Sequence, residues 1–400
     1  MQGKIIGLSY FLHSKAEGHF FSVHSRYHIE FEKRGYKSVY LGQANIPKNT
    51  YWINPELTYN PIELKGLGDR INIQETYRNI GQYIEKNDFI YIFEGNLTYW
   101  FMIALLCNKY GITAHVNLIR SDLIIKDLEE NDQEFKKWMK ICSKISGENV
   151  TVSVLNQKLA QKMENVSNIQ IDVIPTFSGL NKELVDDLKR SFTNYSNGKV
   201  LVAAPYPTDL EILSKTLDLY PDLIDKILVS TWVDKPFDFI KYPVEISNKH
   251  LTDLEYCKSI IESKHLVLLY TNIFHIYGSS SKIYDAALLG KQICVPLGTS
   301  ASEQITLIAD HYIFDSLDLG QIRDAIVNPI FIVVAEKQKV PDEREAVNFL
   351  VDERREFKKN KLLIKILAYI LDFLLNKQAG KNLVNWEDKV LFRILKYLAY

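Results

Sequence analysis

The segment Leu266–Gly298, LVLLYTNIFHIYGSSSKIYDAALLGKQICVPLG, decides the fold. It opens with an apolar run that is typical of a buried strand. A loop then reaches Gly278 and three serines, a helix begins at about Lys282, and Gly290 ends it. A second apolar strand, Ile293–Pro296, follows. Strand, helix and strand in this order predict part of a parallel sheet.

The same alternation continues on both sides of this segment. The predicted strands of the first half are Lys4–Tyr10, Ser38–Leu41, Phe89–Phe93, Ile112–Leu118, Val150–Val154 and Ile171–Ile174. Those of the second half are Lys199–Ala204, Lys226–Ser230, Val244–Ile246, Leu266–Tyr270 and Ile293–Pro296. Two α/β halves, each with its own first strand, predict two Rossmann-like doubly wound domains that face each other across a cleft.

The domain boundaries follow from this pattern. We expect a first domain over residues 1–178 and a second domain over residues 196–335, with Ser178–Gly198 as a polar linker. Residues 336–400 lack strand patterns and are expected to form helices. Among these, Leu362–Leu375 is apolar nearly all round but too short to cross a bilayer.

Two alternatives remain open for this apolar C-terminal run. It either packs back onto the first domain or lies on a membrane surface. Basic residues precede it and would favour anionic lipid, namely Arg354, Arg355, Lys358, Lys359 and Lys361.

Composition limits the classes of partner and location. The chain has 400 residues, 46% of them hydrophobic, and its formal net charge of −1 argues against a nucleic-acid partner. The four cysteines are far apart in sequence and are expected to be buried free thiols. The N-terminal sequence MQGKIIGLSYFLHS has too short an apolar stretch for a signal peptide. We therefore expect a cytoplasmic protein, either free or at the inner face of the membrane.

The loop before the helix at Lys282 has the features of an anion site. The first N–H groups of a helix lack partners within it, and the helix dipole is positive there. The expected donors to a diphosphate are Gly278, Ser279, Ser280, Ser281 and Lys282. Asp285 lies one turn inside the helix and is expected on its surface, where it could accept hydrogen bonds from ribose hydroxyls. The alternative is that the serines only cap the helix and Asp285 complements its dipole.

The segment resembles the nucleotide-sugar half of GT-B glycosyltransferases, especially those of glycosyltransferase family 4. The matching residues are Tyr284–Lys291, which read YDAALLGK, followed by Ile293–Pro296. Asp285 takes the place of the second glutamate of the family's E-x7-E pattern, which contacts the ribose. Glu17-Gly18-His19 looks like the family's first glycine loop. The resemblance covers roughly residues 1–330 and implies a nucleotide-diphosphate sugar as the donor substrate. It also implies that the first domain, 1–178, binds the acceptor and that the second, 196–335, binds the nucleotide sugar.

Five further residues follow predicted strands and are candidates for the site. His19 and Glu94 are the candidate catalytic residues, because each lies in a loop at the carboxyl end of a strand. Gly18 and Arg120 are candidates for contacting the acceptor or a phosphate, and Lys235 for stabilising the leaving diphosphate. Each also has an ordinary interpretation as a turn, capping or surface residue. His115 lies within a strand and is expected to be a core residue.

The sequence thus predicts transfer of a sugar to a hydroxyl of a saccharide or lipid-linked saccharide. No metal-ligand cluster, P-loop or dinucleotide fingerprint is present in the sequence, so we expect no metal and no cofactor. One alternative is a non-catalytic GT-B subunit that supports a partner enzyme, since Tyr277 stands where the family has its first glutamate. Another is a sugar-nucleotide epimerase on the same fold.

Overall fold

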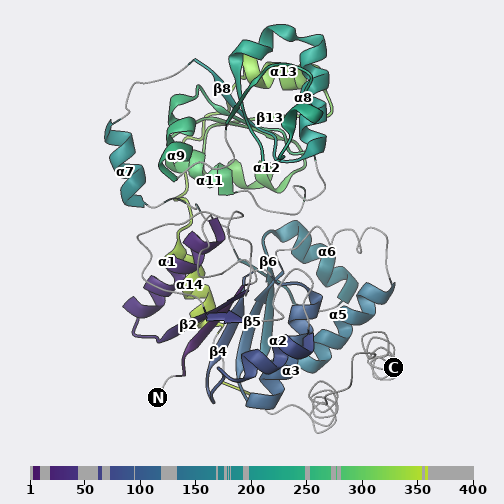
Figure 1. Cartoon of the computed structure of the whole chain (residues 1–400), viewed down its shortest axis with the longest axis vertical. Coiled ribbons are helices and arrows are strands. Elements are labelled where there is room, and N and C mark those ends of the chain that lie inside the picture. Colours follow the sequence, from purple (N-terminus) through teal and green to yellow (C-terminus); the bar gives the residue numbers. More distant parts are fainter. Residues whose placement is uncertain are drawn as a thin grey trace. The chain divides into compact units, whose positions relative to one another are not determined.

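Two parallel β-sheets organise the chain, one in each of two units. The first unit comprises Met1–Pro175 and Glu343–Tyr400, and the second comprises Thr176–Asp342. The structure is a computed structural model (Figure 1). It describes residues 3–9, 19–43, 62–64, 73–93, 95–118, 133–167, 170–174, 178, 180, 182–191, 198–247, 253–271, 276, 281–353 and 356–358.

The sheet of the first unit has seven strands in the order β3-β2-β1-β4-β5-β6-β7, all of them parallel. The strands are β1 (Ile5–Leu8), β2 (Ser38–Gln43), β3 (Ile62–Leu64), β4 (Phe89–Ile92), β5 (Thr113–Asn117), β6 (Val150–Val154) and β7 (Asp172–Val173). The order of the strands reverses between β1 and β4. Such a reversal is the usual place for a ligand in an open α/β sheet.

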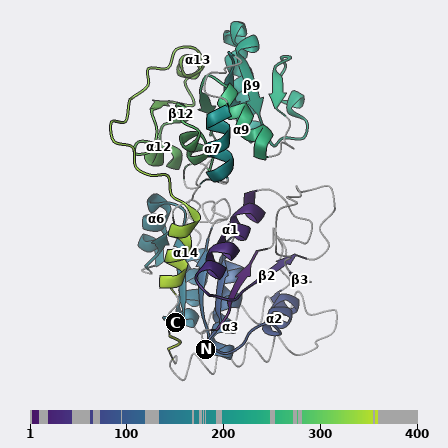
Figure 2. The same cartoon turned by 90° about the vertical axis from the view of Figure 1, so that its left-hand side faces the viewer.

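Helices cover both faces of this sheet (Figures 1 and 2). One face carries α1 (His19–Lys33) and α14 (Glu343–Asp352), which pack against each other. Arg34, just after α1, donates a hydrogen bond of 2.6 Å from Nη1 to Oδ1 of Asn348 in α14. The other face carries α2 (Ile73–Gly81), α3 (Leu97–Tyr110), α5 (Gln133–Ser146) and α6 (Gln157–Ser167). Helix α14, from a late part of the chain, therefore adds to the layer that α1 starts.

The sheet of the second unit has the order β10-β9-β8-β11-β12-β13 and is also parallel. Its strands are β8 (Val200–Ala203), β9 (Ile227–Ser230), β10 (Glu245–Ser247), β11 (Leu266–Leu268), β12 (Ile293–Pro296) and β13 (His311–Phe314). Its helices are α7 (Lys182–Ser191), α8 (Pro207–Leu219), η1 (Pro221–Lys226), η2 (Pro236–Asp238), α9 (Asp253–Glu262), α11 (Ser281–Leu288), α12 (Ser300–Ile305) and α13 (Leu319–Val327).

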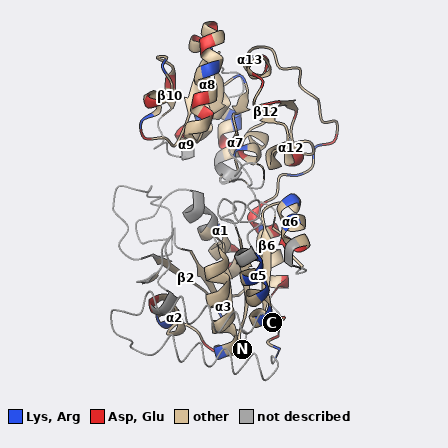
Figure 3. Cartoon of the chain, turned by 90° about the vertical axis from the view of Figure 1, so that its right-hand side faces the viewer, with Lys and Arg blue, Asp and Glu red and all other residues tan. Residues whose placement is uncertain are grey.

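Alternate residues of the central strands enter two separate hydrophobic cores. In β8, Val200 and Val202 face the core formed with α8 and α13, whereas Leu201 and Ala203 face the core formed with α9 and α11. This division explains why buried parallel strands read as unbroken apolar runs. The charged residues lie mostly on helices and loops (Figure 3). The four cysteines are buried free thiols, as expected.

The expectation that Ser178–Gly198 forms a linker was wrong in part. Lys182–Ser191 forms helix α7, whose Val185 and Leu188 are buried in the second unit's core. The sequence is polar here because only one side of this helix is covered. Ser178 and Leu180 are also buried within the second unit.

The C-terminal segment is described only in its first part. Helix α14 and residues 356–358 belong to the first unit. The carboxamide of Asn149 donates to the backbone oxygen of Lys358 at 2.9 Å and accepts from its N–H at 2.8 Å. The predicted helices Leu362–Leu375 and Trp386–Tyr397 lie outside the described residues. Within the ranges given above, no helix combines the length and hydrophobicity that crossing a membrane requires.

Asp285 is buried, which corrects its expected place on the surface of its helix. Only 3% of the residue is exposed. Its Oδ1 accepts a hydrogen bond of 2.6 Å from the hydroxyl of Ser178, and its Oδ2 accepts one of 3.2 Å from the hydroxyl of Tyr256 in α9. The physical reason is that α11 packs with its first turn against these two segments. The carboxylate therefore ties the start of the second unit to α9 and α11.

Replacing Asp285 by Ala should destabilise the protein, contrary to what a surface position would predict. Each buried donor left without a partner costs about 1–3 kcal/mol. We expect the Asp285→Ala substitution to lower the free energy of unfolding by at least roughly 2 kcal/mol, measured by urea denaturation. Asp222→Ala is the matched control, since Asp222 is exposed and forms a surface ion pair with Lys226. Equal stability of the two variants would contradict a structural role for Asp285.

Candidate functional site

The sheet of the second unit has a Rossmann-like strand order, in which ligands bind beside the point where the order reverses. Its order reverses between β8 and β11, so the loops after these two strands flank the expected ligand position. Asp209, in the first turn of α8, ties the two loops together. Its Oδ1 accepts hydrogen bonds from the backbone N–H of Thr271 at 2.9 Å and from its hydroxyl at 2.6 Å. Its Oδ2 accepts one of 3.0 Å from the N–H of Tyr206.

Asp209 was missed at the sequence level. It is fully buried, and burial raises the pKa of its carboxyl, while its hydrogen bonds with Thr271 oppose that shift. The available signal was an acid three residues after Tyr206 at the start of a helix, which is the spacing of a capping box. The partner, Thr271, lies 62 residues away and could not be found from local sequence.

Lys282 brings a cation to this edge of the sheet. It is the second residue of α11, and its Nζ lies 3.4 Å from the hydroxyl of Ser230 at the carboxyl end of β9. The same Nζ lies 5.3 Å from the centre of the Tyr256 ring. Burial lowers the pKa of Lys282 to about 8, and the Asp285 carboxylate opposes that shift. The lysine side chain thus reaches from the helix after β11 to the end of β9.

The remaining donor-site residues are described only in part. Ser281 begins α11, in agreement with the predicted helix start. Gly278, Ser279 and Ser280 lie outside the described residues. Lys235 is exposed and precedes the short helix η2. Of the predicted donor set, the structure therefore brings Lys282 and Asp285 together, with Ser281 beside them in the chain.

The candidate residues of the first unit lie mostly outside the described part of the chain. Helix α1 begins at His19, but the histidine side chain is not described. Gly18, Glu94 and Arg120 lie outside the described residues. Gly95 is described and approaches the end of β5 closely, since its N–H donates to the oxygen of Asn117 at 2.6 Å. A side chain at Gly95 would come within 2.6 Å of Val116, so only glycine fits there.

Two polar residues of β5 have different surroundings. The ring nitrogens of His115 lie 2.8 Å from the hydroxyls of Thr151 and Ser153, so its interpretation as a core residue is confirmed. Asn117, at the carboxyl end of the strand, is buried, and neither atom of its amide has a hydrogen-bond partner in the described structure. Buried amides nearly always have a hydrogen-bond partner, so an amide without one among the described residues is an unusual feature of the carboxyl end of β5. The sequence analysis did not single it out.

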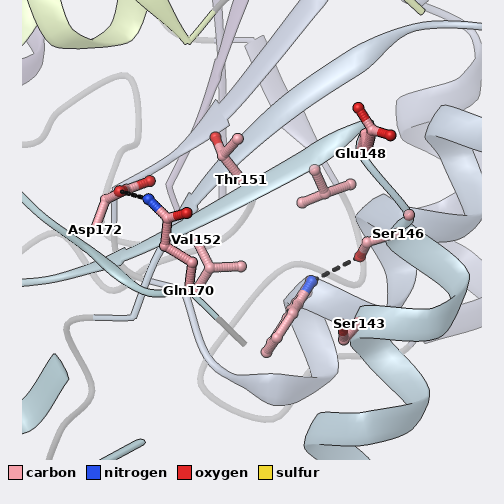
Figure 4. A pocket seen from close by; sticks show the side chains of 10 residues that line it. Ser143, Ser146, Glu148, Thr151, Val152, Gln170 and Asp172 are labelled. Carbon is pink, nitrogen blue, oxygen red and sulfur yellow. Dashed lines mark hydrogen bonds between the residues drawn. The ribbon is translucent and has the colours of Figure 1, made fainter. Parts of the chain in front are cut away.

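A polar pocket of about 340 Å³ lies elsewhere in the first unit (Figure 4). Side chains from the end of α5 line one side of it, and Gln170 and Asp172 line the other. The indole of Trp100 donates a hydrogen bond of 2.8 Å to the hydroxyl of Ser146 at its wall. The pocket adjoins the beginning of β6, away from the carboxyl ends of the strands. None of the predicted site residues lines it.

No group of three or more potential metal ligands occurs among the described parts of the chain. The described part of the carboxyl edge of the second sheet offers the hydrogen-bonding group of Ser230 and the cation of Lys282. These are groups that can hold an anion or a polar ligand.

Comparison with known proteins finds solved structures of similar fold. No family profile and no curated protein sequence matches the chain. Among solved structures, sucrose-phosphate synthase of Thermosynechococcus elongatus aligns with a TM-score of 0.57 at 14% identity, over 94% of this chain and 99% of that one. HepE of Anabaena, in complex with UDP and glucose, aligns with a TM-score of 0.56 at 12% identity, over 94% and 100% of the two chains.

A third similar structure is the UDP-forming trehalose-phosphate synthase of Burkholderia vietnamiensis. Its TM-score is 0.54 at 9% identity, and the alignment covers 95% of this chain and all of that one. Identities this low establish the fold alone. The chain has the fold of these GT-B proteins, with two Rossmann-like α/β domains in one polypeptide.

Proposed function

We propose that the chain is a glycosyltransferase that moves a sugar from a nucleotide-diphosphate donor to a hydroxyl of a saccharide or lipid-linked saccharide. The observation that carries this proposal is the position of Lys282 at the carboxyl edge of a sheet with Rossmann order. The fold supports it, because HepE has been solved with UDP and with UDP-glucose. Assembly of a polysaccharide or other glycan is the setting that this chemistry suits.

In the proposed reaction, the bond between the sugar's anomeric carbon and the diphosphate breaks as the acceptor oxygen bonds to that carbon. The diphosphate leaves with added negative charge, which Lys282 and the N-terminus of α11 would stabilise. The acceptor hydroxyl loses its proton to a base, for which His19 and Glu94 remain our candidates. Gly278, Ser279, Ser280 and Lys235 remain proposed donor contacts, and Gly18 and Arg120 proposed acceptor or phosphate contacts.

Asp285 takes a different part in this proposal from the one that the resemblance implied. Both its oxygens already accept hydrogen bonds inside the protein, so a direct contact with ribose has to share them. Its carboxylate also lies near enough to Lys282 to favour the protonated amine. We therefore assign Asp285 first as a positioning residue for Lys282 and Tyr256. The charge on the leaving group would then be met by basic side chains and backbone amides, without a metal.

Nucleotide binding is the first prediction. The chain should bind uridine or guanosine diphosphate, measured by calorimetric titration with a panel of nucleoside diphosphates. Absence of binding to every member would overturn the proposal. Release of free nucleotide together with a glycan product would establish transfer and exclude an epimerase. Binding without hydrolysis or transfer to any of many acceptors would favour the non-catalytic subunit.

The second prediction concerns the pH dependence of that binding. The pKa of Lys282 is about 8, so in the protein without nucleotide its side chain is mostly charged at pH 7 and mostly neutral at pH 9. Phosphate groups are already ionised above their second pKa of about 6. The affinity for the nucleotide should therefore fall roughly tenfold between pH 7 and pH 9.

Two variants identify Lys282 as the source of this pH dependence. Lys282→Arg keeps a charge that does not titrate in this range, so its affinity should be nearly constant across it. Lys282→Met should bind weakly at both pH values. If Lys282→Arg keeps the slope of the unmodified protein, another group is responsible and Lys282 does not contact the phosphates.

The third prediction concerns the association of Leu362–Leu375 with a membrane surface. Lys358 pairs with Glu148, so it contributes less to a basic surface than its charge suggests. We expect the protein to sediment with anionic vesicles at low salt and to be released at high salt. Lys359→Gln with Lys361→Gln should weaken sedimentation, whereas the control Lys241→Gln should not. If the protein stays in the supernatant at low salt, the membrane proposal is wrong and the C-terminal helices have a structural role.

A further inference from the structure

An exposed tryptophan stands on a fixed turn at the edge of the second sheet. Trp232 follows β9 and is 62% exposed. Its neighbour Thr231 is only 4% exposed, and the hydroxyl of Thr231 accepts a hydrogen bond of 3.2 Å from the N–H of Val233. The turn is therefore anchored on both sides of the tryptophan. An indole held in water by a fixed backbone indicates a contact surface.

A second aromatic ring supports this position. Tyr206 follows β8, which pairs with β9 through Ala203 and Ser230. The rings of Tyr206 and Trp232 lie 6.4 Å apart at an angle of 76°, in an edge-to-face arrangement. The backbone of Tyr206 is itself fixed by Asp209. We call these two residues the aromatic shelf.

The aromatic shelf lies on the same sheet edge as the cation of Lys282. Lys282 reaches Ser230, and Trp232 is two residues further along the chain. The Cα atoms of Ser230 and Trp232 are thus within about 7 Å of each other. Tyr206 also follows the strand next to the reversal point of the sheet. A flat apolar surface and a cation are therefore close together at the edge where ligands bind.

We propose that the aromatic shelf stacks the base of the nucleoside diphosphate whose phosphates Lys282 holds. This inference rests on the proposed function and adds where the base is recognised. Every nucleobase has a flat π-face that can stack on an aromatic side chain, so the shelf would contribute affinity without strong selection among bases. The ribose would then connect a base on Trp232 to phosphates at Lys282.

The test measures the affinity of the full-length chain for UDP and for inorganic pyrophosphate by calorimetry. Trp232→Ala should weaken UDP binding by about 5- to 150-fold, the range typical of one base stacked on an aromatic ring. Pyrophosphate has no base, so its affinity should be unchanged. Trp232→Phe retains an aromatic ring and should bind UDP within about threefold of the unmodified protein.

Leu219→Ala is the matched control. Leu219 is 60% exposed in the same unit but ends α8, so it lies at the opposite edge of the sheet. Its replacement should leave the affinity for UDP unchanged.

The outcomes separate this inference from the proposed function. If the unmodified protein binds no nucleoside diphosphate, both fail. If it binds UDP and Trp232→Ala binds UDP equally well, only the shelf assignment fails. An equal loss of UDP and pyrophosphate would also overturn it, because the substitution would then act on the phosphate site. The shelf assignment would also be overturned if Trp232→Ala weakened only the interaction with the saccharide acceptor, because Trp232 would then be a sugar contact.

Discussion

The buried carboxylate of Asp285 is the interaction on which the second unit's site depends. A charge at this depth is costly unless hydrogen bonds or an opposite charge compensate it. Ser178 and Tyr256 supply the hydrogen bonds, and Lys282 is the nearby cation. Because these partners come from α9, α11 and the segment that opens the unit, the carboxylate fixes three parts of the chain at once. The amine of Lys282 is then held at the end of β9 by contacts that form when the unit folds, before any ligand binds.

Most of the fold followed from local patterns because its strands are buried on both faces. FIYI in β4 and VLVA in β8 are unbroken runs of buried apolar residues, and alternate residues of β8 enter separate cores. Glycine marked the helix ends reliably, since Gly111 and Gly290 adopt the left-handed conformation that favours it. The patterns failed where burial is one-sided or brief. The three-residue strand β3 and the helix α7 were missed for this reason.

The site was harder to predict than the fold because its contacts join distant parts of the sequence. Lys282 and Asp285 were identifiable from their place at a helix start after an apolar strand. The burial of Asp285 was not, since it depends on Ser178, 107 residues earlier. Asp209 and Trp232 were overlooked for the same reason. An acid near a helix start and a tryptophan in a turn gain meaning only once β8, β9 and β11 are known to be neighbours.

The return of the chain to its first unit bears on the order in which the protein folds. The second unit is one continuous stretch, whereas the first needs α14 to cover the face that α1 begins. The bond between Arg34 and Asn348 spans 314 residues. During synthesis, the layer that α1 begins can therefore be completed only after the whole second unit has left the ribosome's active site. The second unit can fold while the first still exposes the apolar surface that Val347 and Leu350 later cover.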